Sequence, residues 1–409
     1  MRRLCSLLGM PQNRFASIHV VGTNGKTSVT RMITALLEAH GVSTGAYVSP
    51  HITSWRERVL IRGEPISEQA FTEALERTEQ AADVADRSAG EEGPVTQFEL
   101  LTAAAFVAFA AARVQYAVVE AGLGGRLDAT NVIPSKLTVL TSVGYDHTEW
   151  LGETLEEIAA EKLAVLRDHT ALITGELPDE VVPVVERFVR ERHATHLWAA
   201  SVANNLLPGY QGKNLAVAQA VAGQVLEVLD ADALAAFAEG LASRRFAIKG
   251  RGELIPGDPP VIFDAAHNPD GAAALAEALA DLAPPRRVRR GFRREWRRAE
   301  VVCCLAILEG KDAPGIVNAL VPAVSHFVCT EIPPERIEGS GRPGGRSRPA
   351  LEVAALCEKA SVEAEAISDP LEAWERTRAL AQERNGVALA AGSHYLLSSI
   401  WTERPAQNS

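Results

Sequence analysis

A glycine-rich stretch near the amino terminus carries the residues best suited to hold phosphate. The segment Val20-Val-Gly-Thr-Asn-Gly-Lys-Thr27 follows the short β-rich run Ser17–Val21 and opens a stretch with helical apolar period, Lys26–His40. Glycines let backbone N–H groups turn towards phosphate oxygens, and the first turn of a helix adds positive partial charge. We expect Lys26 to reach the β- and γ-phosphates of ATP, and the hydroxyl of Thr27 or Ser28 to ligate Mg²⁺.

This phosphate loop departs from the strict GxxxxGK[ST] pattern, because Val20 stands where the first glycine belongs. The alternative is a plain glycine turn before a surface helix, and the strand before it, the helix after it and the GKT core all argue against that reading. The residues predicted to bind the nucleotide here are Gly22, Thr23, Asn24, Gly25, Lys26, Thr27 and Ser28.

Two further residues able to bind a cation follow buried-type strands. Glu120 ends the apolar run Tyr116–Glu120, and His147 follows the run Leu137–Val143. Ligands of doubly wound sheets bind at the carboxyl ends of the strands, so both side chains are candidates for one site. A buried carboxylate is costly without a cation, although a salt bridge from Glu120 to Arg126 is the alternative, and a lone histidine is more often structural.

Strand and helix signals alternate along the part of the chain that carries these residues. Capping-box patterns at Thr96–Glu99 and Thr154–Glu157 open two of the helices. Such an order predicts an α/β fold, a P-loop doubly wound and mostly parallel sheet with helices on both faces. The pattern restarts after Arg245–Lys249 with strand Val261–Asp264, which predicts a smaller Rossmann-like α/β unit. We therefore expect an ATP-binding domain over 1–247 and a C-terminal domain over 248–409. Beyond Val261–Asp264 the expected elements are strands Val301–Leu305, His326–Thr330 and Val387–Ala391, and helices Asp270–Leu282, Ala313–Leu320 and Pro370–Arg384.

Composition narrows the class of protein. The chain has 409 residues, a length that suits two domains. Its net charge of −11 argues against nucleic acid and anionic lipid as partners. Its five cysteines form no CxxC pairs, so we do not expect a zinc site. The most apolar stretch, Leu100–Ala112, is too short to span a bilayer, and no signal peptide is evident, so we expect a cytoplasmic protein without a membrane partner. Two segments, Arg286–Arg298 and Gly339–Pro349, are predicted to be exposed loops; the alternative is contact with an anionic substrate tail.

Several motifs in order resemble one family. The GTNGKT form resembles the Mur ligase superfamily, and Glu120-Ala-Gly-Leu-Gly-Gly-Arg-Leu-Asp-Ala-Thr-Asn131 resembles the ExGLGGRLDATN segment of folylpolyglutamate synthases and dihydrofolate synthases. The other matching segments are Ser49-Pro-His-Ile52, Arg56-Glu-Arg-Val59, Gly144-Tyr-Asp-His147, Glu161-Lys162, Tyr210-Gln211 with Asn214, Gly250-Arg251 and Asp264-Ala-Ala-His-Asn-Pro269.

The resemblance implies an ATP-dependent ligase that joins L-glutamate to a folate or dihydropteroate carboxylate through an acyl phosphate. It also implies two Mg²⁺ sites, with a monovalent cation as a further candidate cofactor, and we expect a monomer. A helix framing the pterin-side pocket is expected to precede Met1 in this family.

The resemblance also assigns roles to individual residues. Thr27 binds one Mg²⁺; Ser49, Glu120 and His147 bind the other, with Asp146 orienting the His147 ring. Lys162 corresponds to a carbamylated lysine, although this chain reads Glu161-Lys-Leu-Ala164 where the family reads EKAG. Lys26, Lys162 and His267 are the implied catalytic residues; Asn214, Arg251 and Asp264 hold the nucleotide; His267 and Ser393 lie near the glutamate substrate.

Two rival functions stay open at this point. The chain reads GKT rather than GKGS, which favours a cell-wall Mur ligase. The GLGGRLDATN segment argues against that function. A non-catalytic ATP-binding switch predicts the loss of Glu120, His147 or Lys162, and all three are present.

Overall fold

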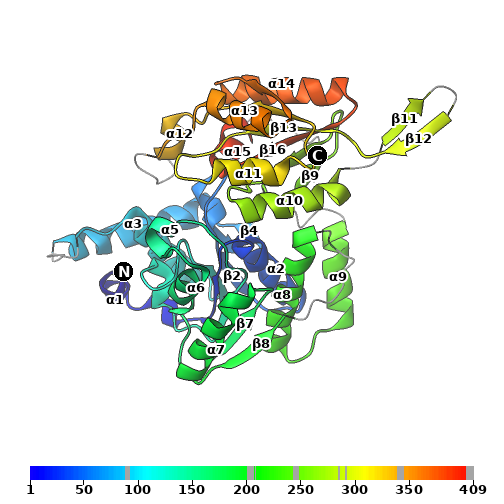
Figure 1. Cartoon of the computed structure of the whole chain (residues 1–409). Coiled ribbons are helices and arrows are strands. Elements are labelled where there is room, and N and C mark those ends of the chain that lie inside the picture. Colours follow the sequence, from blue (N-terminus) through cyan, green and yellow to red (C-terminus); the bar gives the residue numbers. More distant parts are fainter. Residues whose placement is uncertain are drawn as a thin grey trace. The chain divides into compact units, whose positions relative to one another are not determined.

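The computed structural model describes residues 1–87, 93–199, 207, 209–242, 248–283, 286–290, 293–338 and 345–401. It divides into two compact units, the first made of Met1–Leu207 with Gln211–Phe246 and the second of Pro208–Tyr210 with Ala247–Ser409 (Figure 1). The predicted domain limits, 1–247 and 248–409, remain a proposal.

A sheet of eight described strands forms the centre of the first unit, in the order β4-β3-β2-β5-β1-β6-β7-β8. Pairing is parallel from β2 to β8 and antiparallel at β2-β3 and β3-β4, which confirms the mostly parallel α/β fold. The strands are β1 (Ala16–Val21), β2 (Thr44–Tyr47), β3 (Val59–Ile61), β4 (Glu64–Pro65), β5 (Tyr116–Glu120), β6 (Leu137–Leu140), β7 (Ala171–Thr174) and β8 (Thr195–Trp198).

Helices cover this sheet because they bury apolar faces against it. Helix α4 shares one hydrophobic cluster with Ala117 and Val119 of β5, whereas α6 and α7 share another with Val21 and Leu140. Both predicted capping boxes are confirmed, at the starts of α4 and α6. The helices are α1 (Arg2–Leu7), α2 (Lys26–Ala39), α3 (Glu68–Asp86), α4 (Gln97–Ala111), α5 (Thr148–Leu151), α6 (Leu155–Leu163), α7 (Val182–Glu191), α8 (Gly209–Leu226) and α9 (Ala231–Ala242), with 3₁₀ turns η1 (Pro11–Asn13), η2 (Trp55–Arg58), η4 (Ala129–Val132) and η5 (Asp179–Val181).

The second unit holds a smaller sheet in the order β15-β14-β13-β16-β10-β9, parallel except for the β10-β9 pair. Its strands are β9 (Glu253–Ile255), β10 (Val261–Phe263), β13 (Val301–Leu305), β14 (His326–Cys329), β15 (Glu363–Ala366) and β16 (Val387–Ala391). Its helices are α10 (Pro269–Leu282), α11 (Ala313–Leu320), α12 (Pro334–Glu338), α13 (Ala350–Lys359), α14 (Pro370–Glu383) and α15 (His394–Ile400).

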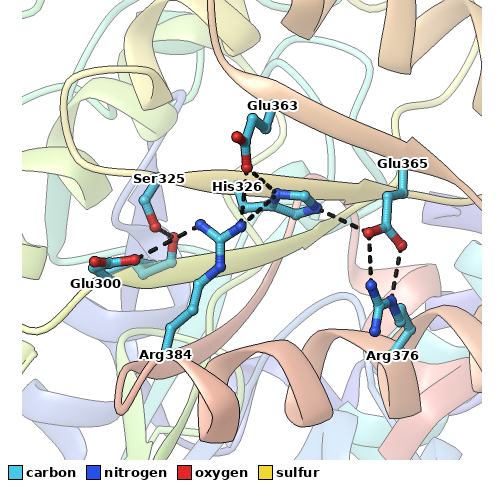
Figure 2. A network of polar contacts seen from close by, with 8 residues as sticks. Glu300, Ser325, His326, Glu363, Glu365, Arg376 and Arg384 are labelled. Carbon is cyan, nitrogen blue, oxygen red and sulfur yellow. Dashed lines mark hydrogen bonds and ion pairs between the residues drawn. The ribbon is translucent and has the colours of Figure 1, made fainter.

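An ionic network ties β14 and β15 to helix α14 and the residue that follows it (Figure 2). The ring of the buried His326 lies between two carboxylates, with Nδ1 3.2 Å from Glu363 and Nε2 3.5 Å from Glu365. Arg376 forms two 2.9 Å hydrogen bonds with Glu365, and Arg384 donates one of 2.9 Å to Glu363. These groups surround the amino-terminal ends of the strands, the edge opposite to the one at which doubly wound sheets bind ligands.

The prediction of a loop over Arg286–Arg298 is wrong. Strands β11 (Arg286–Arg290) and β12 (Arg293–Arg297) form an antiparallel two-stranded sheet. Eight of the thirteen residues in this segment are arginines, so the sequence shows no apolar period from which the strands could be predicted. Of the second predicted loop, Gly339–Pro349, residues 339–344 lie outside the described part, and Ser347 forms an isolated bridge with Leu308.

None of the helices in the described part of the chain is long and apolar enough to cross a membrane.

Candidate active site

The phosphate loop connects β1 to α2 and is held by two residues that follow β6. Thr141 donates to the carbonyl of Asn24 over 2.6 Å, and the hydroxyl of Ser142 accepts the Asn24 N–H over 2.9 Å. Gly22 has φ of +152°, and a Cβ there would lie 2.0 Å from the Thr141 hydroxyl. Glycine is therefore required sterically as well as conformationally at the start of the loop.

Lys26 begins helix α2, and its ammonium donates to the carbonyls of Gly22 at 2.9 Å and Thr23 at 3.1 Å. Asn214 of α8 lies against the same loop, because a Cβ on Gly25 would lie 2.6 Å from its Oδ1. Two residues predicted to bind nucleotide from distant parts of the sequence are thus neighbours within the first unit.

Glu120 is the buried carboxylate of this site, with only 1% of its surface exposed. The Thr27 hydroxyl donates to its Oε1 over 3.0 Å, and the backbone N–H of Ser49 donates to its Oε2 over 3.2 Å. Arg126 pairs with Glu161 at 3.0 Å, so that arginine has a carboxylate partner other than Glu120. The structure brings together three of the four residues predicted to bind metal.

These residues fit Mg²⁺ chemically. Hydroxyl and carboxylate oxygens are hard donors, and Mg²⁺ is usually held by one or two carboxylates together with substrate phosphates and waters rather than by an all-protein cage. Among the described residues no cluster of three or more His, Cys, Asp and Glu side chains could hold a metal ion by itself.

His147, the fourth predicted ligand, lies after β6 in the left-handed region with φ of +53°. Asp146 accepts its backbone N–H at 3.0 Å and lies 3.9 Å from its Nε2, while Nδ1 lies 3.9 Å from Glu149. Asp146 thus lies 3.9 Å from the ring, and both its orienting role and the role of His147 as a ligand stay predictions.

Lys162 is buried on α6 with 3% of its surface exposed, and its Nζ donates to the carbonyl of Gly22 over 3.2 Å. Burial, and then the neighbouring charge of Lys26, lowers the pKa of Lys162 to about 7. The lysine predicted from the sequence therefore contacts the phosphate loop, and its pKa lies well below that of an ordinary lysine.

In the second unit, Asp264 organises the turn that carries Arg251. Its Oδ2 accepts hydrogen bonds from the hydroxyl of Tyr210 at 2.5 Å and from the Gly252 N–H at 2.7 Å, and its Oδ1 accepts the Ala266 N–H at 2.8 Å. Burial raises the pKa of Asp264, although these hydrogen bonds and the charge of Arg251 act to lower it. Asp264 and Arg251 are thus parts of one local structure.

The two residues predicted near the glutamate substrate also lie in this unit, at loops that open helices. The ring of His267 contacts the Ala265 carbonyl through Nδ1 at 2.8 Å, just before α10. Ser393 is buried, with 1% exposed, and its hydroxyl accepts the Tyr395 N–H at 3.2 Å as the cap of α15. A capping role accounts for Ser393 locally, and its contact with substrate remains a prediction.

Sequence reasoning missed Thr141 and Ser142, which fix the phosphate loop. The signal was available, because both hydroxyls directly follow a buried strand at its carboxyl end, where Glu120 and His147 were singled out.

Comparison with known proteins identifies the class. The Mur ligase middle domain matches residues 20–176, and the Mur ligase glutamate ligase domain matches residues 250–394. A Mur-type ligase that uses ATP is also the class defined by the fold and by the phosphate loop with its buried carboxylate.

Individual relatives define the family. The dihydrofolate synthase/folylpolyglutamate synthase of Mycobacterium tuberculosis is 35% identical over 378 residues, which cover 80% of this chain and 72% of that protein. The folylpolyglutamate synthase of the same organism, solved with ADP and AMPPCP, is 30% identical, with a TM-score of 0.85 over 99% of this chain and 95% of that one. The bifunctional enzyme of Yersinia pestis, solved with AMPPNP and Mn ion, is 26% identical, with a TM-score of 0.79 over 98% and 92%. The chain belongs to the dihydrofolate synthase/folylpolyglutamate synthase family of ATP-dependent glutamate ligases. The cell-wall alternative is not the function of these relatives.

Proposed function

We propose that this enzyme joins L-glutamate to the carboxylate of dihydropteroate, of a reduced folate or of both, with ATP forming an acyl phosphate. The observation that carries the proposal is the buried Glu120 between the Thr27 hydroxyl and the Ser49 N–H, next to the phosphate loop. The names of the relatives and the glutamate ligase domain match support the acceptor and the amine.

The residues of the first unit suit the phosphoryl-transfer half of the reaction. A carboxylate is a poor electrophile, and transfer of the γ-phosphoryl to its oxygen creates a leaving group that the glutamate amine can displace. Such transfer needs positioning and charge compensation more than covalent help. The N–H groups of the glycine loop and the ammonium of Lys26 would hold the phosphates, with Asn214 against the loop.

Thr27, Ser49, Glu120 and His147 would hold two Mg²⁺ ions, which supply charge compensation for the phosphate oxygens when bound. The Mn ion and AMPPNP in the Yersinia pestis enzyme support a divalent metal with the nucleotide. A monovalent cation is a further cofactor that we propose from the family resemblance, and potassium dependence of the rate tests it.

We also propose that Lys162 is carbamylated. Its uncharged amine would attack CO₂, forming the N–C bond and releasing one proton, and the resulting anion would help hold the second metal. Burial supports this, because it favours the uncharged amine that the reaction needs. A carbamate signal with ¹³C-bicarbonate by NMR, absent from Lys162→Met, is expected, and identical spectra would remove the assignment.

For the second unit we propose that Arg251 and Asp264 bind the nucleotide, and that His267 and Ser393 lie near the incoming glutamate. Arg251 is a planar fork donor suited to phosphate. The three hydrogen bonds that Asp264 accepts within its own unit support its role in shaping the Arg251 turn.

The decisive experiment is glutamate-dependent ADP release with ATP and Mg²⁺, with 7,8-dihydropteroate compared against a reduced folate monoglutamate. Turnover with either acceptor is expected, and the ratio of the two rates defines which synthase activity dominates. Turnover only with a UDP-muramyl acceptor would overturn the proposal in favour of a cell-wall ligase.

We place the enzyme in the cytoplasm, a reducing compartment, because its five cysteines are free and buried. The expected monomeric state is a further proposal that analytical ultracentrifugation tests.

A further inference from the structure

An imidazole lies in the middle of the central strand of the first unit. His19 is fully buried in β1, next to its parallel register partner Val119 on β5. Buried polar side chains are normally hydrogen-bonded, and the Nε2 of His19 lies 2.8 Å from the hydroxyl of Thr130. Burial, with the charge of Arg167 as a smaller cause, lowers the pKa of His19 to about 3, so the ring is neutral at physiological pH.

The hydroxyl of Thr130 continues the chain of hydrogen bonds to Asp128. It bonds to Asp128 Oδ1, which also accepts the Thr130 N–H at 2.9 Å, and Asp128 Oδ2 accepts the Leu123 N–H at 2.9 Å. Burial raises the pKa of Asp128, and the donors that converge on its carboxyl group act against that rise.

The hydroxyl of Thr130 donates to Asp128 Oδ1, and this bond sets the direction of the whole chain. Because a hydroxyl has only one hydrogen, Thr130 accepts from the Nε2–H of His19. The Nδ1 atom of His19 is then an acceptor, and none of the described residues offers it a partner. An unpaired acceptor is more tolerable in a protein interior than an unpaired N–H, which agrees with this tautomer.

The chain of bonds ends in the loop 121–131, which follows Glu120. Asp128 closes this loop through its bonds to Leu123 and, from its own N–H, to the Gly125 carbonyl at 3.2 Å. Gly125 packs directly on α6, because a Cβ there would lie 2.7 Å from the Lys162 carbonyl oxygen. The loop thus begins at Glu120 and rests on the helix that carries Lys162.

We propose that His19 is a positioning residue that, through Thr130 and Asp128, holds the loop 121–131 against helix α6 and so sets Glu120 relative to Lys162. The effect of His19 on catalysis rests on the proposed function. The effect of its hydrogen bonds on the loop 121–131 can be tested without any measurement of activity.

Limited trypsin digestion of the full-length protein reports the position of the loop. Arg126 lies in the loop with 59% of its side chain exposed, and Leu127, which follows it, is 91% exposed. Opening of the loop exposes the bond after Arg126, and cleavage tracks the open population. His19→Phe should speed this cleavage by roughly five- to tenfold, the loss of about one buried hydrogen bond. Thr130→Val loses two such bonds and should speed it at least as much.

Conservative variants and a matched control separate the relay from general destabilisation. His19→Gln keeps an N–H donor and Thr130→Ser keeps the hydroxyl, so both should restore the wild-type cleavage rate. Thr78→Val removes a buried hydroxyl of α3 that donates to the Ala74 carbonyl over 2.7 Å, outside the relay, and should leave that rate unchanged. Unchanged cleavage after Arg126 in His19→Phe, or an equal increase after Arg113, which lies outside the loop, would overturn the proposal.

Activity supplies a second readout. In His19→Phe the Mg²⁺ concentration for half-maximal ADP release should rise by roughly tenfold, whereas a smaller fraction of folded enzyme would lower only the maximum rate. An unchanged Mg²⁺ requirement would overturn the link to Glu120. Wild-type protein without glutamate-dependent ADP release would instead overturn the proposed function and leave the digestion result intact.

Discussion

The Nζ atom of Lys162 lies 3.2 Å from the carbonyl oxygen of Gly22, which joins the end of α6 to the phosphate loop by a buried hydrogen bond. The two residues are 140 positions apart in the chain. Because the ammonium is desolvated and lies near Lys26, this bond places an amine that readily loses its proton beside the site expected to hold phosphate.

The pH dependence of stability should reveal this lysine. Its pKa falls from 10.5 to about 7 on folding, so the unfolded chain binds more protons between these values and stability rises with pH across that window. Lys162→Met should remove this rise, which amounts to about 2 kcal/mol between pH 7 and pH 9. Urea unfolding in CO₂-free buffer at pH 7 and pH 9 measures it, and parallel pH profiles for the two proteins would contradict it.

Loss of the buried carboxylate should abolish ligation while leaving the fold intact. Glu120→Ala removes the acceptor of the Thr27 and Ser49 bonds, and with it the predicted metal ligand. Glutamate-dependent ADP release should fall by roughly a thousandfold or more, with an unchanged circular dichroism spectrum. Glu153→Ala, at an exposed glutamate, is the matched control. Ligation at the wild-type rate in Glu120→Ala would sink the metal assignment.

Alanine substitutions at two glycines with similar backbone angles should have different effects on nucleotide binding. Gly25 has φ of +84° and Gly41 has φ of +78°, but a Cβ on Gly25 meets Asn214 at 2.6 Å, whereas one on Gly41 meets nothing within 4 Å. Each alanine substitution should cost about 1 kcal/mol of stability through backbone strain. Only Gly25→Ala should also weaken ATP binding, by tenfold or more, because it displaces the side chain beside the phosphate loop. Equal ATP affinities by calorimetry would refute this.

The ionic network of Figure 2 should stabilise the second unit only modestly. The hydrogen bonds from Arg376 lower the pKa of Glu365. The stabilisation by this pair is therefore fully present above the unfolded glutamate pKa of about 4.3, and it is lost as pH falls through the lower pKa of the folded state. Both side chains are about a third exposed, so Arg376→Met should cost about 0.5 kcal/mol at pH 7 and less in high salt.

Urea unfolding at pH 7 and pH 3 checks the prediction for Arg376. Arg348→Met serves as control, since Arg348 reaches Glu352 through a single 3.4 Å contact and should cost less. A loss of stability in Arg376→Met that is as large at pH 3 as at pH 7 would show that packing, not charge, is responsible.

Local structure was the part of this protein that sequence reasoning predicted well. The strand, glycine loop and helix around Lys26, both capping boxes and helix Ala313–Leu320 agree with the structure. These features depend on hydrogen bonds and apolar periods within a few residues, which are visible in a short window of sequence. The pairing of β11 with β12 was not predicted, because these arginine-rich strands show no apolar period in the sequence.

The α/β fold, the phosphate loop and the types of residue at the carboxyl ends of the strands could all be predicted from the chain alone. Three contacts could not: Asn214 against Gly25, Lys162 with Gly22, and His19 with Thr130. Each of these pairs is separated by more than a hundred residues. Such contacts depend on the order of strands in the sheet and on which helix faces pack together. A local pattern in the sequence gives neither the distance nor the direction between two residues so far apart in the chain.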